Sequence, residues 1–275
     1  MKVSKRFVDR AKPALRRFQK VLESARRRDV NESDTSVIVS DMLTEILGYD
    51  KYQEVTTELS VRSTFCDLAI KIGGRLQYLI EVKSIGTELK ENHLRQAIEY
   101  GSREGIEWVL LTNGHLWQAH RIRFEQPIDH DLVFEIDLLS DETTTSDLLE
   151  KLYLVSREAG SVSVIDLYWQ SKEATSRYVL AHVVLSEGVL HAIRRQVRAL
   201  FKETRVTIDE LSLLLESEVL KRELLEGDKA EAAAKTVKRA VRRRRRALRN
   251  TEPGDITSNA PTAQPRADTK LPPSA

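Results

Sequence analysis

Apolar residues recur every three or four positions in two stretches at the beginning of the chain, and this spacing predicts two helices. Residues 5–28 carry the first apolar stripe, which lies among lysines and arginines. Residues 34–47 carry the second, with Ser33 or Asp34 as the expected cap and Gly48 as the end. These two helices precede every strand signal in the chain.

After residue 52 the apolar period changes to two, which is typical of strands with one buried face. Two glycines and an Asn-Gly pair mark two hairpin turns between such strands. A helical pattern over residues 88–104 separates the two hairpins. The predicted strands are residues 55–61, 65–72, 76–83, 108–112 and 116–122, with a possible edge strand at 131–138.

The order of these elements predicts an α/β (α+β) fold with an αβββαββ core, followed by a small α-helical domain. The expected domains are a basic N-terminal helix (1–28), the core domain (29–140) and a helical region that ends in a basic run (145–250). Residues 251–275 hold five of the seven prolines, and we expect a disordered basic tail there.

The composition excludes several classes of protein. No apolar run approaches the roughly 20 residues that span a bilayer, and the basic N-terminus is not followed by the apolar segment of a secretory signal. We therefore expect a cytoplasmic protein that does not contact a membrane. Cys66 is the single cysteine, so neither an internal disulfide nor a thiolate zinc cluster can form. The six histidines form no zinc-hydrolase pattern, and His93 and His115 are expected to be structural or surface residues.

The net charge of +2 conceals an uneven distribution along the chain. Residues 1–28 carry +9 and residues 235–275 carry +8, which leaves −15 on residues 29–234. Basic segments attract polyphosphates because binding releases condensed counterions, so the two ends are candidate nucleic-acid contacts. The alternative is a pair of solvated helices with a solubilising tail.

Acidic and basic side chains interrupt two adjacent apolar strands at short range. Asp67 lies in the second predicted strand, and Glu81 and Lys83 lie two residues apart in the third, hence on one face of the sheet. A three-residue turn at 73–75 pairs Ile72 with Leu76 and places Asp67 opposite Glu81. A two-residue turn would rotate Asp67 away from Glu81. The three-residue turn is the one that permits a shared site.

Two carboxylates beside an ammonium group suit phosphodiester hydrolysis. Asp67 and Glu81 can hold Mg²⁺ (or Mn²⁺), while Lys83 orients or activates water and offsets phosphate charge. The alternative is a structural salt bridge between Lys83 and one of the carboxylates. The upstream aspartate, the glycine turn and the flanking helix favour the nuclease interpretation.

Several segments between residues 31 and 138 match the pattern of a known family. They are Asn31-Glu32-Ser33-Asp34-Thr35, Phe65-Cys66-Asp67, Ile80-Glu81-Val82-Lys83, Gln96-Ala97-Ile98-Glu99-Tyr100, Leu110-Leu111-Thr112-Asn113-Gly114 and Trp117. Through these segments, residues 31–138 resemble the N-terminal nuclease domain of type I restriction enzyme R proteins and their stand-alone relatives, a branch of the PD-(D/E)XK superfamily. The resemblance implies a restriction-endonuclease-like fold for the core, with Asp67, Glu81 and Lys83 in the catalytic positions of a restriction-modification nuclease. It also implies a role at the site for Gln96 and Tyr100, which look like the QxxxY motif of that branch.

The same resemblance suggests Glu32, ahead of Glu45, as an acidic residue that assists metal binding. Tyr100 could instead be a core aromatic, Gln96 a capping or surface residue, and each glutamate a surface carboxylate. The sequence departs from the family in two respects: Cys66 stands where the motif name has proline, and no phosphate-binding motor loop is present. We therefore expect no ATP site, and a motor or specificity subunit would have to be a separate partner.

The basic run from Lys235 to Arg249 holds nine lysines and arginines and no acidic residue. It predicts nonspecific contact with the DNA backbone rather than reading of base sequence. The expected function is a Mg²⁺-dependent DNA endonuclease, or a nuclease subunit of a restriction or defence system, possibly as a homodimer. The alternative is a catalytically silent DNA-binding or regulatory protein that keeps the fold. The candidate nucleic-acid-binding residues are Lys238, Arg239, Arg242, Arg243, Arg244, Arg245 and Arg246.

Overall fold

The computed structural model describes residues 2–61, 64–124, 126–160, 163–203 and 205–251. The chain divides into two compact units, residues 1–173 and residues 174–275. The expected disordered tail lies outside the described residues, apart from Thr251. No helix in the described part of the chain is long and apolar enough to cross a membrane.

The first unit is built around a six-stranded mixed sheet with the order β1-β2-β3-β4-β5-β6. Neighbouring strands are antiparallel except β3 and β4, which are parallel and connected by η1 (Glu91–Leu94) and α3 (Arg95–Glu104). The strands are β1 (Val55–Val61), β2 (Thr64–Ile72), β3 (Arg75–Val82), β4 (Trp108–Thr112), β5 (Leu116–Arg123) and β6 (Asp129–Asp137). The coarse prediction of a mixed α/β fold is confirmed, and the possible edge strand is present as β6.

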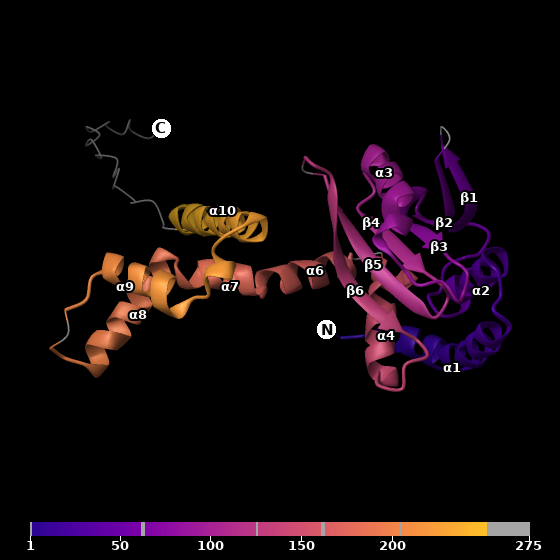
Figure 1. Ribbon diagram of the computed structural model, residues 1–275, viewed down its shortest axis with the longest axis horizontal. Coiled ribbons are helices and arrows are strands. Elements are labelled where there is room, and N and C mark those ends of the chain that lie inside the picture. Colours follow the sequence, from indigo (N-terminus) through magenta and orange to yellow (C-terminus); the bar gives the residue numbers. More distant parts are fainter. Residues whose placement is uncertain (1, 62–63, 125, 161–162, 204, 252–275) are drawn as a thin grey trace, which may run out of the picture. The chain divides into compact units, whose positions relative to one another are not determined.

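Helices cover both faces of this sheet (Figure 1). On one face α3 packs through a small cluster that includes Ala97 and Tyr100. On the other face a larger core joins the sheet to α1 (Lys5–Arg28), α2 (Glu32–Glu45) and α4 (Thr145–Leu154). The short α5 (Arg157–Gly160) and α6 (Val164–Ala174) follow.

The basic N-terminal helix α1 is an integral part of the first unit. Its apolar stripe, from Phe7 to Leu22, is buried in the larger core, while most of its cationic residues are exposed. The boundary between the two units also differs from the expected start of the helical region at residue 145. It falls after residue 173, at the end of α6. The helix cap of α2 differs as well, because the Asn31 side chain, rather than Ser33 or Asp34, accepts the Asp34 N–H at 2.9 Å.

The turn between β2 and β3 is where the sequence prediction was wrong. Ile72 pairs with Arg75, so the turn has two residues, not three. Gly73 and Gly74 both have positive φ, at 57° and 78°, as the tight mirror-image hairpin turn requires. Gln77 then enters β3 as an extra residue, because the register shifts between Ile70↔Tyr78 and Lys71↔Leu76. The two-residue turn and the one-residue bulge together shift the pairing of β2 with β3 by the same amount as the predicted three-residue turn.

The regular secondary structure of the second unit is all helical over its described residues. Its helix α10 packs lengthwise on α7 through a cluster that contains Val179, Ala233 and Val237. The elements are α7 (Arg177–Val184), α8 (Glu187–Leu200), α9 (Ile208–Leu214), the π-helical η2 (Leu215–Val219), the 3-10 helix η3 (Arg222–Leu224) and α10 (Asp228–Thr251).

Candidate active site

Glu81 and Lys83 lie at the carboxyl end of β3, in the middle of the sheet. The Lys83 ammonium nitrogen Nζ lies 2.7 Å from Glu81 Oε1. The backbone N–H of Lys83 donates to the Thr112 carbonyl at 2.8 Å, which continues the pairing of β3 with β4 beyond Val82. Both side chains are largely buried, with exposed fractions of 18% for Lys83 and 8% for Glu81. The pair is therefore held in a fixed, poorly hydrated position.

The second oxygen of Glu81, Oε2, is buried and has no hydrogen-bond partner among the described residues. A buried carboxylate oxygen without a partner carries a desolvation penalty of about 1–3 kcal/mol or more. Burial raises the pKa of Glu81, Lys83 opposes that rise, and the nearby Asp67 carboxylate adds to it. This oxygen is suited to a cation or a hydrogen-bond donor brought from outside.

Asp67 lies on the neighbouring strand β2, and the register Leu68↔Ile80 places it opposite Glu81. By the two-residue alternation of strands, both carboxylates share the α3 face of the sheet with Ala69. Asp67 Oδ2 accepts the Val82 N–H at 2.7 Å. Burial raises the pKa of Asp67, while this hydrogen bond and the Lys83 charge oppose the rise. The bulge at Gln77 thus brings Asp67, Glu81 and Lys83 to one end of the sheet.

Glu32 approaches the same site from the first turn of α2. Its Oε2 lies 3.5 Å from Lys83 Nζ, and half of its side chain is exposed. Burial lowers the pKa of Lys83, but the hydrogen bond to Glu81 and the three neighbouring carboxylates outweigh it, so the net shift is upward. Glu45, at the other end of α2, pairs instead with Arg17. Glu32 is therefore the acidic residue of α2 that lies at the site.

Gln96 and Tyr100 occupy different environments on α3. Gln96 is exposed, whereas Tyr100 is 5% exposed and belongs to the core cluster that contains Cys66. Burial raises the pKa of Tyr100, and the Glu104 carboxylate and the Cys66 thiol add to the shift. The structure thus places Tyr100 where the core interpretation expected it, and Gln96 on the surface.

A buried polar network at this end of the sheet was missed by sequence reasoning. Asn113 Nδ2 donates to the Thr87 carbonyl at 2.9 Å and so fixes the loop that follows Lys83. His115 Nδ1 lies 3.0 Å from Asp137 Oδ1. In the sequence, the Asn113-Gly114 pair was fully accounted for as a hairpin turn. Nothing in the local pattern indicated that the Asn113 side chain hydrogen-bonds to another loop.

The carboxylate oxygens at this site suit a small divalent cation. Such oxygens are the ligands that Mg²⁺ prefers, and Glu81 Oε2 is buried with no hydrogen-bond partner among the described residues. In the described part of the chain, no group of three or more His, Cys, Asp or Glu side chains is arranged to hold a metal ion. That arrangement is compatible with Mg²⁺, which is usually bound by one or two carboxylates and keeps several waters or substrate phosphates.

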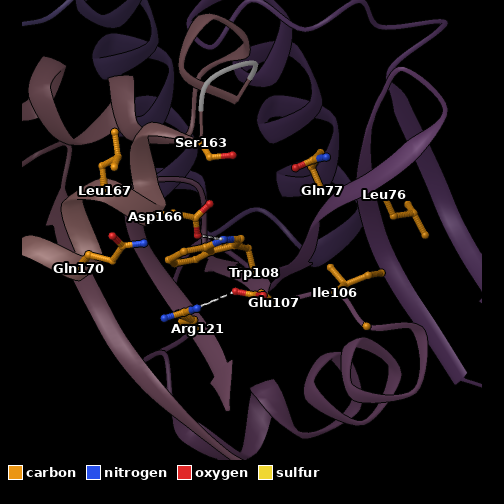
Figure 2. A pocket seen from close by; sticks show the side chains of 11 residues that line it. Leu76, Gln77, Ile106, Glu107, Trp108, Arg121, Ser163, Asp166, Leu167 and Gln170 are labelled. Atoms are coloured by element: carbon orange, nitrogen blue, oxygen red, sulfur yellow. Dashed lines mark hydrogen bonds and ion pairs between the residues drawn. The ribbon is translucent and has the colours of Figure 1, made fainter. Parts of the chain in front are cut away.

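A separate pocket lies at the other end of β3, and Figure 2 shows the side chains that line it. It has a volume of about 560 Å³ and includes Gln77, the extra residue of the bulge. Trp108 Nε1 donates to Asp166 Oδ1 at 3.1 Å, and Arg121 pairs with Glu107 at 2.9 Å. None of the predicted site residues lines this pocket.

The seven candidate nucleic-acid-binding residues lie on α10 in the second unit, and all seven are exposed.

The fold and the site together define the class of the first unit as a mixed α/β domain with a carboxylate–lysine cluster at the end of its central strands. Comparisons of this chain with protein-family models, curated proteins and solved structures found no match.

Proposed function

We propose that this chain is a metal-dependent DNA endonuclease of the PD-(D/E)XK type, with Asp67, Glu81 and Lys83 in its active site. The observation that supports the proposal most strongly is the state of Glu81. One of its oxygens contacts the Lys83 ammonium at 2.7 Å, and the other is buried, with no hydrogen-bond partner among the described residues, on the side of the sheet shared with Asp67. A purely structural ion pair has no need of an unsatisfied carboxylate oxygen, whereas a metal ligand does.

Each residue then has a distinct part in phosphodiester hydrolysis. Asp67 and Glu81 would hold the metal ion, with Glu32 as a peripheral carboxylate. When bound, Mg²⁺ or Mn²⁺ would polarise the scissile phosphate and assist ionisation of a water molecule. Lys83 carries the positive charge that holds a phosphate oxygen and orients the attacking water. Asn113 keeps the loop after Lys83 in place and so acts as a positioning residue.

The resemblance of residues 31–138 to type I restriction R proteins suggests the biological setting. A nuclease subunit of a restriction or defence system would act with a motor or specificity subunit, since this sequence contains no ATP-binding motif. Gln96 is exposed and Tyr100 belongs to the core. The role at the site that the resemblance implies for them stays a prediction.

A second candidate function is a DNA-binding or regulatory protein in which the site is a structural ion-pair cluster. The contact of Lys83 with Glu81 and, at 3.5 Å, with Glu32 favours this alternative, because it satisfies the ammonium group without a ligand. Under this interpretation an internal water molecule satisfies the second Glu81 oxygen.

The test is a cleavage assay with Mg²⁺ or Mn²⁺ on single-stranded, duplex and modified DNA. Lys83→Ala is compared with wild type and with Lys51→Ala, a control in the same unit whose half-exposed lysine pairs with Asp41. We expect activity that requires the metal, survives Lys51→Ala and is reduced by Lys83→Ala by about two orders of magnitude or more, as for loss of an electrostatic catalytic group. Absence of metal-dependent cleavage on every substrate, or equal activity of Lys83→Ala, would favour the regulatory alternative.

A further inference from the structure

The second unit contains a cavity of about 540 Å³ where α7, α8 and α10 meet. It lies wholly within residues 182–245 and is independent of the carboxylate–lysine site of the first unit. Its charged and titratable lining residues are His182, Glu187, Glu216, Lys238, Arg242 and Arg245.

The three cations of the cavity lie on a different stripe of α10 from Arg239 and Arg243. Lys238, Arg242 and Arg245 stand at i, i+4 and i+7, which puts them on one stripe of α10. That stripe adjoins the apolar residues Val237 and Val241, which pack against α7. The cavity therefore takes its charge from exposed cations that border the apolar face of α10. Arg239 and Arg243 do not line it.

Two of these cations lack an ionic partner. Arg245 pairs with Glu187 at the start of α8. Among the described residues Lys238 and Arg242 have no ion pair, and the remaining carboxylate of the cavity, Glu216, accepts a hydrogen bond from Ser212 at 3.1 Å. Three cations against two carboxylates leave the cavity with a net positive charge.

The same cavity contains an unsatisfied buried nitrogen. His182 Nε2 is inaccessible to solvent and has no hydrogen-bond partner among the described residues, although the side chain as a whole is half-buried. A buried polar atom in this state is destabilising unless a ligand or a water satisfies it. An oxyanion oxygen would accept a hydrogen bond from Nε2–H while neutralising the two free cations.

We propose that this cavity binds a phosphate group, held by Lys238, Arg242 and the Nε2–H of His182. The cationic groups supply charge-assisted hydrogen bonds, and the histidine supplies a directed donor. The proposal rests on the proposed function only for the source of the phosphate, which would be DNA. It gives α10 one fixed phosphate contact in place of a uniform basic surface.

The test measures binding of the full chain to duplex DNA in EDTA, where a metal-dependent nuclease is silent, so its outcome does not depend on the proposed activity. The cavity variant is Lys238→Gln with Arg242→Gln. The matched control is Arg239→Gln with Arg243→Gln, which removes the same charge at the same i, i+4 spacing on the same helix. We expect the cavity variant to lose affinity by about tenfold more than the control, the effect of one charge-assisted hydrogen bond of roughly 1.5 kcal/mol or more.

His182→Phe provides a second test that does not alter charge. It keeps a planar ring but removes the unsatisfied nitrogen, so we expect an unchanged or higher unfolding temperature together with weaker DNA binding. Loss of affinity on 5′-hydroxyl and 5′-phosphorylated duplexes alike identifies an internal phosphodiester as the ligand, and loss on the phosphorylated duplex alone identifies a terminal phosphate. Displacement of DNA by millimolar inorganic phosphate, absent in the cavity variant, identifies free phosphate as a further ligand. The proposal is overturned if the two double variants lose affinity equally and His182→Phe binds like wild type.

Discussion

Replacement of Asp67 by Asn separates a metal ligand from a structural carboxylate. Asp67 Oδ2 accepts the Val82 N–H at 2.7 Å, and an asparagine carbonyl oxygen can accept the same hydrogen bond. The substitution therefore removes mainly a buried negative charge, which burial and Glu32 disfavour and which Lys83 favours. Because these contributions oppose one another, we expect the metal-free variant to unfold within about 1 kcal/mol of wild type.

The metal response should change much more. A ligand that binds only the folded state stabilises it by about 2.7 kcal/mol at a hundredfold excess over its dissociation constant. For a unit of this size that corresponds to a rise of roughly 5–10 °C in unfolding temperature. We expect this Mn²⁺- or Mg²⁺-induced rise in wild type and in Asp41→Asn, a surface control, and its loss in Asp67→Asn. The reasoning is refuted if Asp67→Asn is several kcal/mol less stable without metal while the metal-induced rise is retained.

Three further predictions concern the packing of the described residues. Burial lowers the pKa of His120 to about 4 in the folded protein, so the unfolded chain binds more protons at this residue below pH 6.5. The free energy of unfolding should therefore fall by about 2 kcal/mol between pH 7 and pH 5, and His120→Gln should reduce this fall in urea titrations. A Cβ at Gly101 would lie 2.9 Å from the backbone oxygen of Ile106, so Gly101→Ala should lose about 1–3 kcal/mol, whereas Gly188→Ala, in open space, should not. Burial raises the pKa of the Cys66 thiol to about 12, so a thiol reagent should modify it only as fast as the protein opens, and rapid labelling under native conditions would contradict this.

Local patterns in the sequence were sufficient for most of the fold. The helix over residues 5–28 and the hairpin at Asn113-Gly114 follow from apolar period and turn chemistry, which depend on neighbouring residues. The bulge at Gln77 could not be predicted in this way, because an extra residue in one strand depends on how both strands meet the core. The expected turn length was wrong. In the structure Asp67 nevertheless lies opposite Glu81, because the bulge adds the residue that the shorter turn lacks.

The candidate site shows a similar division. The strand period placed Glu81 and Lys83 on one face, and the structure adds their contact at 2.7 Å. The i, i+4 spacing of Gln96 and Tyr100 implied one helix face, but burial separates them, because the boundary of the core crosses that face. The reach of Asn113 to the loop after Lys83 is a contact between residues distant in sequence, for which a single sequence contains no signal.

The basic run in α10 shows why charge counting along the sequence is incomplete. The run looked like a uniform electrostatic segment, but the helical period assigns its members to different surroundings. Val237 and Val241 anchor the helix on α7, and the adjoining cations line a cavity with an unsatisfied histidine nitrogen. Deleting residues 235–275 would therefore remove packing as well as charge, and any loss of DNA binding could reflect unfolding of the second unit. Single-face charge substitutions leave the apolar contacts intact, so they distinguish a located phosphate contact from a diffuse basic surface.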